Sequence, residues 1–325
     1  MTYLITGACG FIGSNFLKYM MEKYENGEFI LYDSLTYAGK LSNIEWALED
    51  KRVKFYIGDI KNGDLVENLF KRHKIDYVIN FAAESHVDRS IEYPDIFLES
   101  NVLGVNTLLK VCRKYWKNRR DVKFLQISTD EVYGSLTLEN REEKFRENTP
   151  LNPRSPYSAS KASGDMLLMA YGETYGIPFN ITRCSNNYGE HQLEEKLIPL
   201  VIKKALKNEK LPIYGKGDNV RDWIYVMDHC KGVDLVLHRG KPGEIYNIGG
   251  NSEMSNIDLV KNILDILEKP YDLITFVKDR PGHDKRYGID SSKIERELGW
   301  KRDYDFKRGL LKTVNWYKEL WEKKI

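Results

Sequence analysis

Gly7–Gly13 reads GACGFIG, and this stretch decides the fold of the chain. It comes directly after the apolar run Tyr3–Thr6, and a segment with Phe16, Leu17 and Met20 at helical spacing follows it. The context therefore predicts a strand, a tight glycine-rich turn and a helix.

The three glycines of this stretch suit a backbone that passes close to a negatively charged group. Gly7 permits the tight turn, Gly10 lets backbone amides approach a pyrophosphate, and Gly13 lets helix and strand pack closely. The N-terminus of the helix then faces the negative charge. The GxxGxxG spacing is one residue wider than the commonest dinucleotide fingerprint, and glycines also mark ordinary turns.

Further short runs of β-branched and aromatic residues alternate with helix-length segments. Because the runs are mostly apolar rather than alternating, they are typical of strands that helices cover on both faces. The pattern predicts an α/β, Rossmann-type, doubly wound parallel sheet with a smaller C-terminal substrate-binding lobe. We expect residues 1–188 to form the NAD-binding domain, about 223–250 to return to it, and 189–222 with 251–325 to form the lobe. The predicted strands after the first are Phe29–Tyr32, Val53–Ile57, Tyr77–Phe81, Phe124–Ile127 and Phe179–Thr182.

The charge balance excludes a broad electrostatic attraction to nucleic acid or to an anionic membrane. Fifty basic and forty-eight acidic side chains leave a formal net charge of +2. The four cysteines stand far apart, without the spacing of a zinc or redox motif, and no group of residues has metal-ligand spacing. With no signal-like start and no apolar run long enough to span a bilayer, we expect a cytoplasmic protein without a metal.

Asp33 sharpens the cofactor prediction, because it ends the second strand twenty positions after Gly13. A carboxylate there accepts hydrogen bonds from ribose hydroxyls and repels a 2′-phosphate by about 1 to 4 kcal/mol, which favours NAD over NADP. The alternative is that Asp33 only caps a turn or a helix. Asp59, Ile60 and the pair Ala82–Ala83 also follow strands, where they would line the adenine and ribose pockets.

Two segments carry the candidate chemistry, Ser128–Gly134 (STDEVYG) and Tyr157–Lys161 (YSASK). On a helix Tyr157 and Lys161 share a face, so we expect the ammonium group to lower the pKa of the phenol toward that of a useful base. A bare YxxxK pattern is common by chance. The pattern becomes strong evidence together with the glycine stretch upstream and Thr129 at the end of a strand, because the glycine stretch, Thr129 and the YxxxK pattern follow one another in the expected order.

The combination resembles the extended short-chain dehydrogenase/reductases. Several longer stretches of sequence, called strings below, resemble more specifically the dTDP-glucose 4,6-dehydratase family. The likeness covers nearly the whole chain. The strings are Asp33–Gly39 (DSLTYAG), Ala82–Ser90 (AAESHVDRS), Ser185–Gly189 (SNNYG), Glu195–Pro199 (EKLIP), Arg221–Trp223 (RDW) and Asp279–Asp284 (DRPGHD).

The resemblance implies a lyase that oxidises a sugar at C4, removes water across C5 and C6, and returns the hydride to C6. It implies that Tyr157 takes the C4 hydroxyl proton, that Lys161 tunes Tyr157 and holds the nicotinamide ribose, and that Thr129 hydrogen-bonds near C4. Glu131 resembles the base for the C5 proton and Asp130 the acid for the leaving hydroxyl, so Asp130 must stay protonated through a raised pKa. The alternative is that Asp130 and Glu131 cap the turn or lie in solvent.

The remaining site residues are also implied by the resemblance, with Arg221 and Arg280 as candidates for the diphosphate and His86 near the glucosyl unit. The expected NAD contacts are Gly7, Gly10, Phe11, Ile12, Gly13, Asp33, Ser34, Leu35, Thr36, Asp59, Ile60, Ala82, Ala83, Ser85, Ser100, Tyr157, Lys161 and Asn187. The expected substrate contacts are His86, Thr129, Asn186, Lys196, Leu197, Pro212, Ile213, Tyr214, Arg221, Asn256, Arg280, His283 and Tyr287.

Two other functions share part of this pattern. A nucleotide-sugar 4-epimerase also uses NAD and a Tyr-Lys pair but needs no acid and base for elimination, and a redox-inactive NAD-binding sensor or scaffold would have lost the chemistry. Helices near Asp95–Tyr115 and Tyr157–Tyr175 resemble those of a four-helix dimer interface, although exposed faces are the alternative. We assign no role to the charged loop 138–148, and the stripe on the last helix, Phe306–Lys323, predicts core packing.

Overall fold

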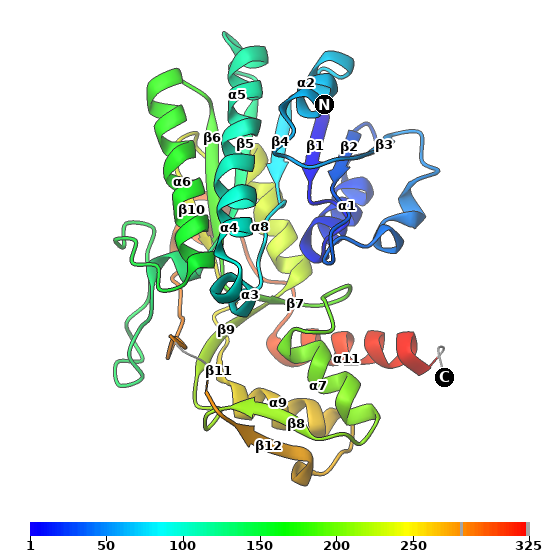
Figure 1. Cartoon of the computed structure of the whole chain (residues 1–325), viewed down its shortest axis with the longest axis vertical. Coiled ribbons are helices and arrows are strands. Elements are labelled where there is room, and N and C mark those ends of the chain that lie inside the picture. Colours follow the sequence, from blue (N-terminus) through cyan, green and yellow to red (C-terminus); the bar gives the residue numbers. More distant parts are fainter. Residues whose placement is uncertain (280–281, 323–325) are drawn as a thin grey trace.

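A seven-stranded parallel sheet forms the centre of the computed structural model, which describes residues 1–279 and 282–322 (Figure 1). Its strand order is β10-β6-β5-β4-β1-β2-β3, so the Rossmann-type prediction is confirmed. Each predicted strand is present, and β10 lies within the stretch expected to return to the sheet. The bounds are β1 Thr2–Thr6, β2 Glu28–Asp33, β3 Val53–Ile57, β4 Tyr77–Asn80, β5 Lys123–Thr129, β6 Phe179–Cys184 and β10 Ile245–Ile248.

Helices cover both faces of the sheet and bury an apolar cluster on each. Helices α1 and α8 pack together on one face, while α2, α5 and α6 line the other. The helix before α5 is continuous with it through a π-helical segment at Glu99–Gly104. The bounds are α1 Phe11–Lys23, α2 Gly63–Arg72, α3 Val87–Glu92, α4 Pro94–Leu98, α5 Val105–Trp116, α6 Pro156–Tyr175 and α8 Val226–Arg239.

The smaller part of the molecule lies beyond the carboxyl ends of the central strands, in the lower half of Figure 1. A three-stranded sheet of order β11-β9-β7 leads into it, and the parallel pair β12 and β8 packs with α7, α9 and α11. The bounds are β7 Asn186–Tyr188, α7 Leu197–Leu206, β8 Leu211–Tyr214, β9 Val220–Tyr225, β11 Glu253–Ser255, α9 Asn256–Ile266, β12 Ile274–Val277 and α11 Phe306–Glu322. Helix α10, Ser292–Leu298, instead packs against α8 and β10 of the central sheet.

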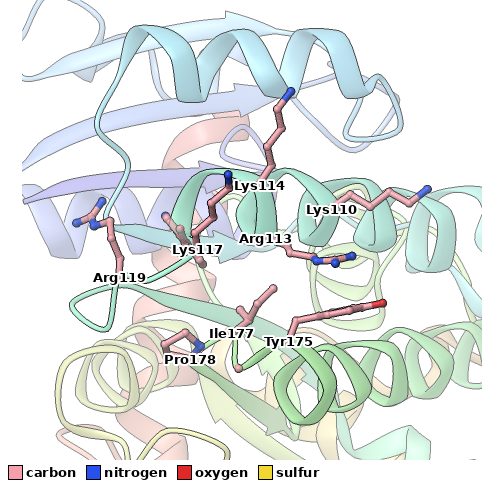
Figure 2. Close-up of a pocket in the computed structure, with 10 residues that line it drawn as sticks. Lys110, Arg113, Lys114, Lys117, Arg119, Tyr175, Ile177 and Pro178 are labelled. Carbon is pink, nitrogen blue, oxygen red and sulfur yellow. The ribbon is translucent and has the colours of Figure 1, made fainter.

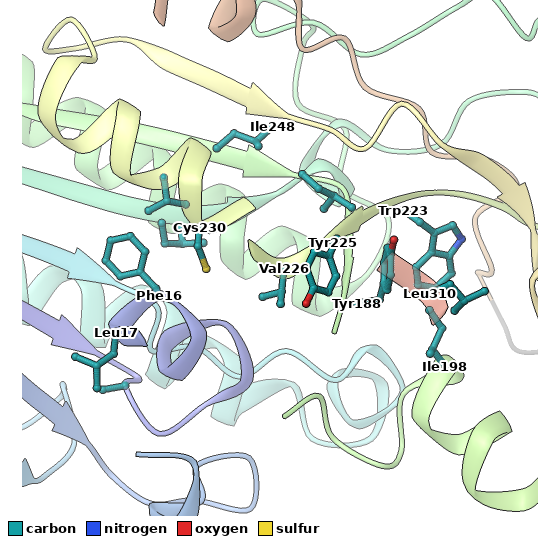
Figure 3. Packing of buried hydrophobic residues seen from close by; sticks show 14 of the residues in the cluster. Phe16, Leu17, Tyr188, Ile198, Trp223, Tyr225, Val226, Cys230, Ile248 and Leu310 are labelled. Atoms are coloured by element: carbon teal, nitrogen blue, oxygen red, sulfur yellow. The ribbon is translucent and has the colours of Figure 1, made fainter. Parts of the chain in front are cut away.

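One apolar cluster runs from the central sheet into the smaller part (Figure 3). Phe16 of α1 lies at one end of this cluster, and Ile198 of α7 and Leu310 of α11 lie at the other. Between them stand Tyr188 and Tyr225, whose ring centroids are 5.8 Å apart. The predicted core stripe of the last helix joins this cluster, because Leu310, Val314 and Tyr317 are buried there.

The charged loop 138–148 is exposed over most of its length but is held at several points, among them the buried Phe145, whose backbone N–H donates to the Gly288 carbonyl at 2.9 Å. Arg286 is fully buried, and its guanidinium donates to the backbone carbonyls of Asn140, Arg141 and Glu143 at 2.8–3.0 Å. The same guanidinium pairs with the carboxylate of Glu253. The loop is thus attached to the segment that precedes Tyr287, one of the expected substrate contacts.

Neither a membrane span nor a metal cluster is found among the described residues. No helix within 1–279 and 282–322 combines the length and apolarity that crossing a bilayer requires. Over the same residues, no three His, Cys, Asp or Glu side chains gather as they would around a metal ion.

Candidate active site

The glycine-rich turn after β1 has the close packing that its sequence predicts. Gly7 adopts φ +65°, and a Cβ there would lie 2.6 Å from the backbone nitrogen of Ala82. A Cβ at Gly13 would lie only 2.2 Å from the carbonyl oxygen of Gly7, so both positions require glycine. The N-terminus of α1 therefore opens on the edge of the sheet between β1 and β4, where the strand order reverses.

Asp33 combines a structural role with a place in the candidate cofactor site. Its carboxylate accepts hydrogen bonds from the backbone N–H groups of Cys9 and Leu35, both at 2.8 Å. Burial raises the pKa of this carboxyl, and the two backbone hydrogen bonds oppose that rise. Because a carboxylate has about four acceptor positions, it retains capacity for ribose hydroxyls while it braces the glycine turn.

A long hollow runs along the carboxyl ends of the central strands, from Asp33 at one end to Tyr157 and Lys161 at the other. Its two parts share Gly7, Gly10, Phe81 and Ala83, so they form one extended site that suits a dinucleotide. Leu35 does not line it. The expected cofactor residues that line it are Gly7, Gly10, Phe11, Ile12, Gly13, Asp33, Ser34, Thr36, Asp59, Ile60, Ala82, Ala83, Ser85, Ser100, Tyr157, Lys161 and Asn187.

The five expected catalytic residues meet where β5 ends beside α6. Thr129 is the last residue of β5, and Asp130 begins a 3-10 turn. The Thr129 hydroxyl donates to Asp130 Oδ1 at 3.2 Å and accepts from the Glu131 N–H at 3.3 Å. Tyr157 and Lys161 reach the same point from the first turns of α6, and Thr129, Glu131, Tyr157 and Lys161 all line the hollow.

Asp130 has the environment of an acid that stays protonated. Only 2% of the residue is exposed, and its Oδ2 has no hydrogen-bond partner among the described residues. Burial raises the pKa of Asp130 well above its usual range, and the charges of Glu131 and Asp222 raise it further. The expected raised pKa is confirmed, and Asp130 does not lie in solvent.

The prediction that Lys161 lowers the pKa of Tyr157 is wrong for this structure. The Lys161 ammonium instead donates to the Ile127 carbonyl at 2.7 Å. Burial raises the pKa of Tyr157 well above 10.0, and the charge of Glu131 adds to the rise, whereas the Thr129 hydroxyl lowers it. Helical spacing places the two side chains on one face, but burial and the carboxylate of Glu131 outweigh the effect of the ammonium group.

We expect Asp130→Asn to raise thermal stability at neutral pH and to lower turnover about a hundredfold or more. A carboxyl whose pKa is raised by folding contributes stability that is complete below its unfolded pKa of about 3.9 and is lost as pH rises toward the folded pKa. Asparagine does not titrate, so its advantage should grow with pH. Melting temperatures measured across a pH series, with the exposed Asp272→Asn as control, test this; an advantage that shrinks with rising pH would contradict it.

Two expected substrate residues lie directly beside the acid pair. The Arg221 guanidinium stacks over the Tyr287 ring at 4.3 Å and donates to the carbonyls of Val220 and Asp284. The charges of Glu131 and Arg221 both act on the Tyr287 phenol, which places the three groups around one space. Asn186 and Lys196 line the hollow, and the Lys196 ammonium donates to the Ser85 carbonyl at 3.4 Å.

The other expected substrate residues are distributed more widely. His86 caps the N-terminus of α3 and lies 3.7 Å from the Glu195 carboxylate. His283 pairs with Asp279 at 2.6 Å, and the Tyr214 ring stands edge-on to it. Of the expected substrate residues only Thr129, Asn186 and Lys196 line the hollow. Those that do not line it are His86, Leu197, Pro212, Ile213, Tyr214, Arg221, Asn256, His283 and Tyr287. Ile213 has its side chain in the core, and Arg280 lies outside the described residues.

Several residues that sequence reasoning missed also shape the site. Ser185 and Gln192 line the hollow. The charge of Asp222 raises the pKa of Asp130. Asn101, in the π-helical segment, exchanges hydrogen bonds with the Glu84 backbone and donates to the Ser160 hydroxyl at 2.9 Å. A signal existed only for Ser185 and Asp222, which belong to the strings that carry the family resemblance.

A second hollow lies between the C-terminal ends of α5 and α6, away from the catalytic residues (Figure 2). Cations line it, but carboxylates neutralise several of them: Lys114 pairs with Glu67, and Arg119 pairs with Asp76 and Asp121. Basic side chains are also favourable at helix C-termini. This hollow contains no residue expected to bind cofactor or substrate.

Comparison with known proteins shows the family of this chain. A family model described as GDP-mannose 4,6-dehydratase matches residues 4–313. A dTDP-glucose 4,6-dehydratase of Xanthomonas campestris is 50% identical over 97% of this chain and 93% of its own length.

Two solved structures are similar over almost the whole chain. A dTDP-glucose 4,6-dehydratase from Bacillus anthracis in complex with NAD is 47% identical, with a TM-score of 0.91 and coverage of 99% of this chain and 98% of that one. A dTDP-glucose 4,6-dehydratase from Streptomyces venezuelae with NAD bound is 44% identical, with a TM-score of 0.93 and coverage of 98% and 97%.

Proposed function

Because the chain belongs to the GDP-mannose 4,6-dehydratase family and is 44–50% identical over nearly its whole length to several dTDP-glucose 4,6-dehydratases, we propose roles for its site residues in that reaction. The protein is an NAD-dependent hydro-lyase that converts dTDP-glucose to dTDP-4-keto-6-deoxyglucose. The observation that carries the assignment of roles is the buried acid Asp130 next to Glu131, beside Tyr157. A 4-epimerase has no use for that acid.

When bound, NAD would supply the acceptor and donor of the hydride and a positively charged nicotinamide ring. The glycine turn and the N-terminus of α1 would hold its pyrophosphate, and Asp33 would accept from the adenosine ribose. Lys161 would hold the nicotinamide ribose with the N–H groups that remain after its bond to Ile127. The neighbouring positive ring would also oppose the burial and the carboxylate that raise the Tyr157 pKa.

Tyr157 and Thr129 act at sugar C4 in this proposal. The Tyr157 phenolate removes the C4 hydroxyl proton as the hydride leaves, and the Thr129 hydroxyl hydrogen-bonds the same oxygen. Both side chains line the hollow at its inner end. Oxidation must come first, because the C5 proton becomes acidic only when C4 is a ketone.

Glu131 and Asp130 then remove water. Glu131 takes the C5 proton, the released electron pair forms the C5–C6 double bond, and the C6 hydroxyl departs with the proton of Asp130. A neutral carboxyl is required for that last step, and burial keeps Asp130 neutral. Return of the hydride to C6 and of the proton on Glu131 to C5 would complete the product. Loss of the Tyr157 proton and uptake of a proton by Asp130 would restore both side chains, so no net oxidation occurs.

The decisive experiment follows one hydrogen atom. Purified protein is incubated, without added NAD, with dTDP-glucose that carries deuterium at C4. Deuterium at C6 of a 4-keto-6-deoxy product is expected from the internal hydride cycle. Label that stays at C4 of unreacted substrate or of a galactosyl epimer would contradict these roles.

The smaller part of the chain, 189–222 with 251–325, is proposed as the nucleotide-sugar-binding lobe. Arg221 and Lys196 supply positive charge near the hollow, which suits a diphosphate. Tyr214 and His283 form an aromatic pair further out, which suits a nucleobase. The remaining expected substrate residues stay predictions.

We also propose a homodimer, in the cytoplasm and without nucleic acid or membrane partners. The helical segments from α4 to α6 expose large apolar side chains, Leu103 and Met166 at 56% each. Such exposure on two helices that pack together suits a second copy of the same surface (Figure 1).

Leu103→Glu and Met166→Glu are each expected to convert a dimer into a monomer, because a charge would be buried in the interface. Light scattering at micromolar concentration measures the mass. Leu311→Glu is the matched control, since Leu311 is an exposed apolar residue on α11. A monomeric wild type would contradict the proposal.

A further inference from the structure

We propose that Asp165 is a positioning residue whose buried carboxylate keeps Lys161 protonated and fixes the end of β5 that carries Thr129. The proposal rests on the roles assigned above to Lys161 and Thr129. Asp165 does not line the hollow, so its role is to act through Lys161 and Thr129.

The geometry joins three elements behind the catalytic residues. Asp165 lies one helical turn after Lys161 on α6, and its side chain is fully buried. Its Oδ2 accepts from the Ser128 hydroxyl at 2.9 Å and from Arg183 Nε at 3.1 Å. Ser128 immediately precedes Thr129 in β5, and Arg183 is its partner across the ladder in β6. The carboxylate therefore ties α6 to the strand end on which the chemistry depends.

Arg183, which pairs with this carboxylate, is itself held in place. Its guanidinium lies 4.8 Å from the centre of the Tyr133 ring, and Tyr133 donates to Asn247 at 2.8 Å. Burial raises the pKa of Asp165, but the charges of Arg183 and Lys161 and the hydrogen bond from Ser128 oppose the rise. Its Oδ1 has no hydrogen-bond partner among the described residues, so the ion pair of Oδ2 with Arg183 is the main contact that favours the charged form.

Lys161 needs a negative charge nearby, because it is buried and makes no ion pair within 4.0 Å among the described residues. Burial lowers the pKa of its ammonium group, and Asp165 is the largest influence that opposes this. Cys184 also faces it from β6, but burial raises the pKa of that thiol to about 12, so it is neutral.

The other groups around this end of the site do not replace Asp165. Burial raises the pKa of both Asp130 and Tyr157 well above their usual ranges, which favours the neutral form of each. The carboxylate of Glu131 acts on Tyr157 and Asp130 but is not among the influences on Lys161. The alternative is that Asp165 only stabilises the fold through its ion pair with Arg183. The pH dependence of NAD affinity distinguishes this structural role from the positioning role.

The test is Asp165→Asn, which preserves the shape of the side chain and removes its charge. NAD affinity and kcat/KM are measured against pH with the full-length protein. In the variant, NAD affinity and kcat/KM are both expected to fall at alkaline pH and to approach wild-type values as the pH decreases. The pH at which half of each value is lost should be about one to two units lower than in the wild type. NAD affinity is the sharper readout, because the protonation of Asp130 contributes to turnover.

Two further variants keep the result interpretable. If Asp165→Asn does not fold because Arg183 is left unpaired, the double variant Asp165→Leu/Arg183→Met removes both charges and should show the same alkaline shift. Tyr133→Phe disturbs the same buried network without changing charge, so its midpoint should match the wild type.

A loss that is equal at every pH in a folded variant, or a midpoint that does not move, would overturn the positioning role and leave only the structural ion pair. Failure of the proposed function is distinguishable, because it would appear in the wild type as an absence of deuterium at C6. The NAD affinity profile does not depend on dehydration.

Discussion

Glu131→Gln is expected to stop water loss while NAD binding and the fold remain intact. Glutamine preserves the shape of the side chain but cannot accept the C5 proton, and general base catalysis contributes about 10²- to 10⁴-fold to a rate. Turnover should fall by that factor. Oxidation at C4 should persist, so the near-ultraviolet absorbance of reduced nicotinamide should build up when substrate is added to the holoenzyme.

Glu45→Gln, at an exposed position outside the hollow, is the matched control and should behave as the wild type. Circular dichroism and NAD affinity establish that the Glu131 variant is folded. Turnover equal to that of the wild type would show that another group removes the C5 proton.

Tyr157→Phe should fail one step earlier, because the phenol that takes the C4 hydroxyl proton is gone. We expect a loss of turnover of about 10²- to 10⁴-fold, with no reduced nicotinamide formed on addition of substrate. This absence distinguishes the variant from Glu131→Gln. The measurement is the same absorbance experiment on the holoenzyme.

Tyr171→Phe on the same helix provides the comparison, since its hydroxyl donates to Asn106 outside the hollow. Rapid formation of reduced nicotinamide by the Tyr157 variant would show that another residue is the base at C4. The two variants together therefore test the order of oxidation and elimination.

The sheet and the cofactor turn could be predicted because their causes are local. Apolar runs of strand length and the spacing of Gly7 and Gly13 depend on neighbours in the sequence, and the structure places them as expected. The family resemblance similarly named Arg221 and Tyr287 as substrate residues, and the charges of Arg221 and Glu131 both act on the Tyr287 phenol.

The electrostatics could not be predicted in the same way, because they depend on contacts between distant segments. Spacing on a helix predicted that Lys161 would lower the pKa of Tyr157. In the structure, burial and the charge of Glu131 raise that pKa instead. Asp222, which raises the Asp130 pKa, comes from a strand 92 positions further along the chain. The sequence alone likewise could not show that Ile213 faces the core or that Arg183 meets Asp165.

The uninterrupted packing from Phe16 through Tyr188 and Tyr225 to Leu310 limits how this enzyme can be re-engineered. A substrate lobe transplanted from a relative would bring its own aromatic and aliphatic shapes into an interior to which both parts contribute, and mismatched volumes there leave cavities or clashes. Chimaeras made by exchanging whole lobes should therefore be insoluble more often than variants altered only at the rim of the hollow. New sugar-nucleotide preferences are better sought one side chain at a time.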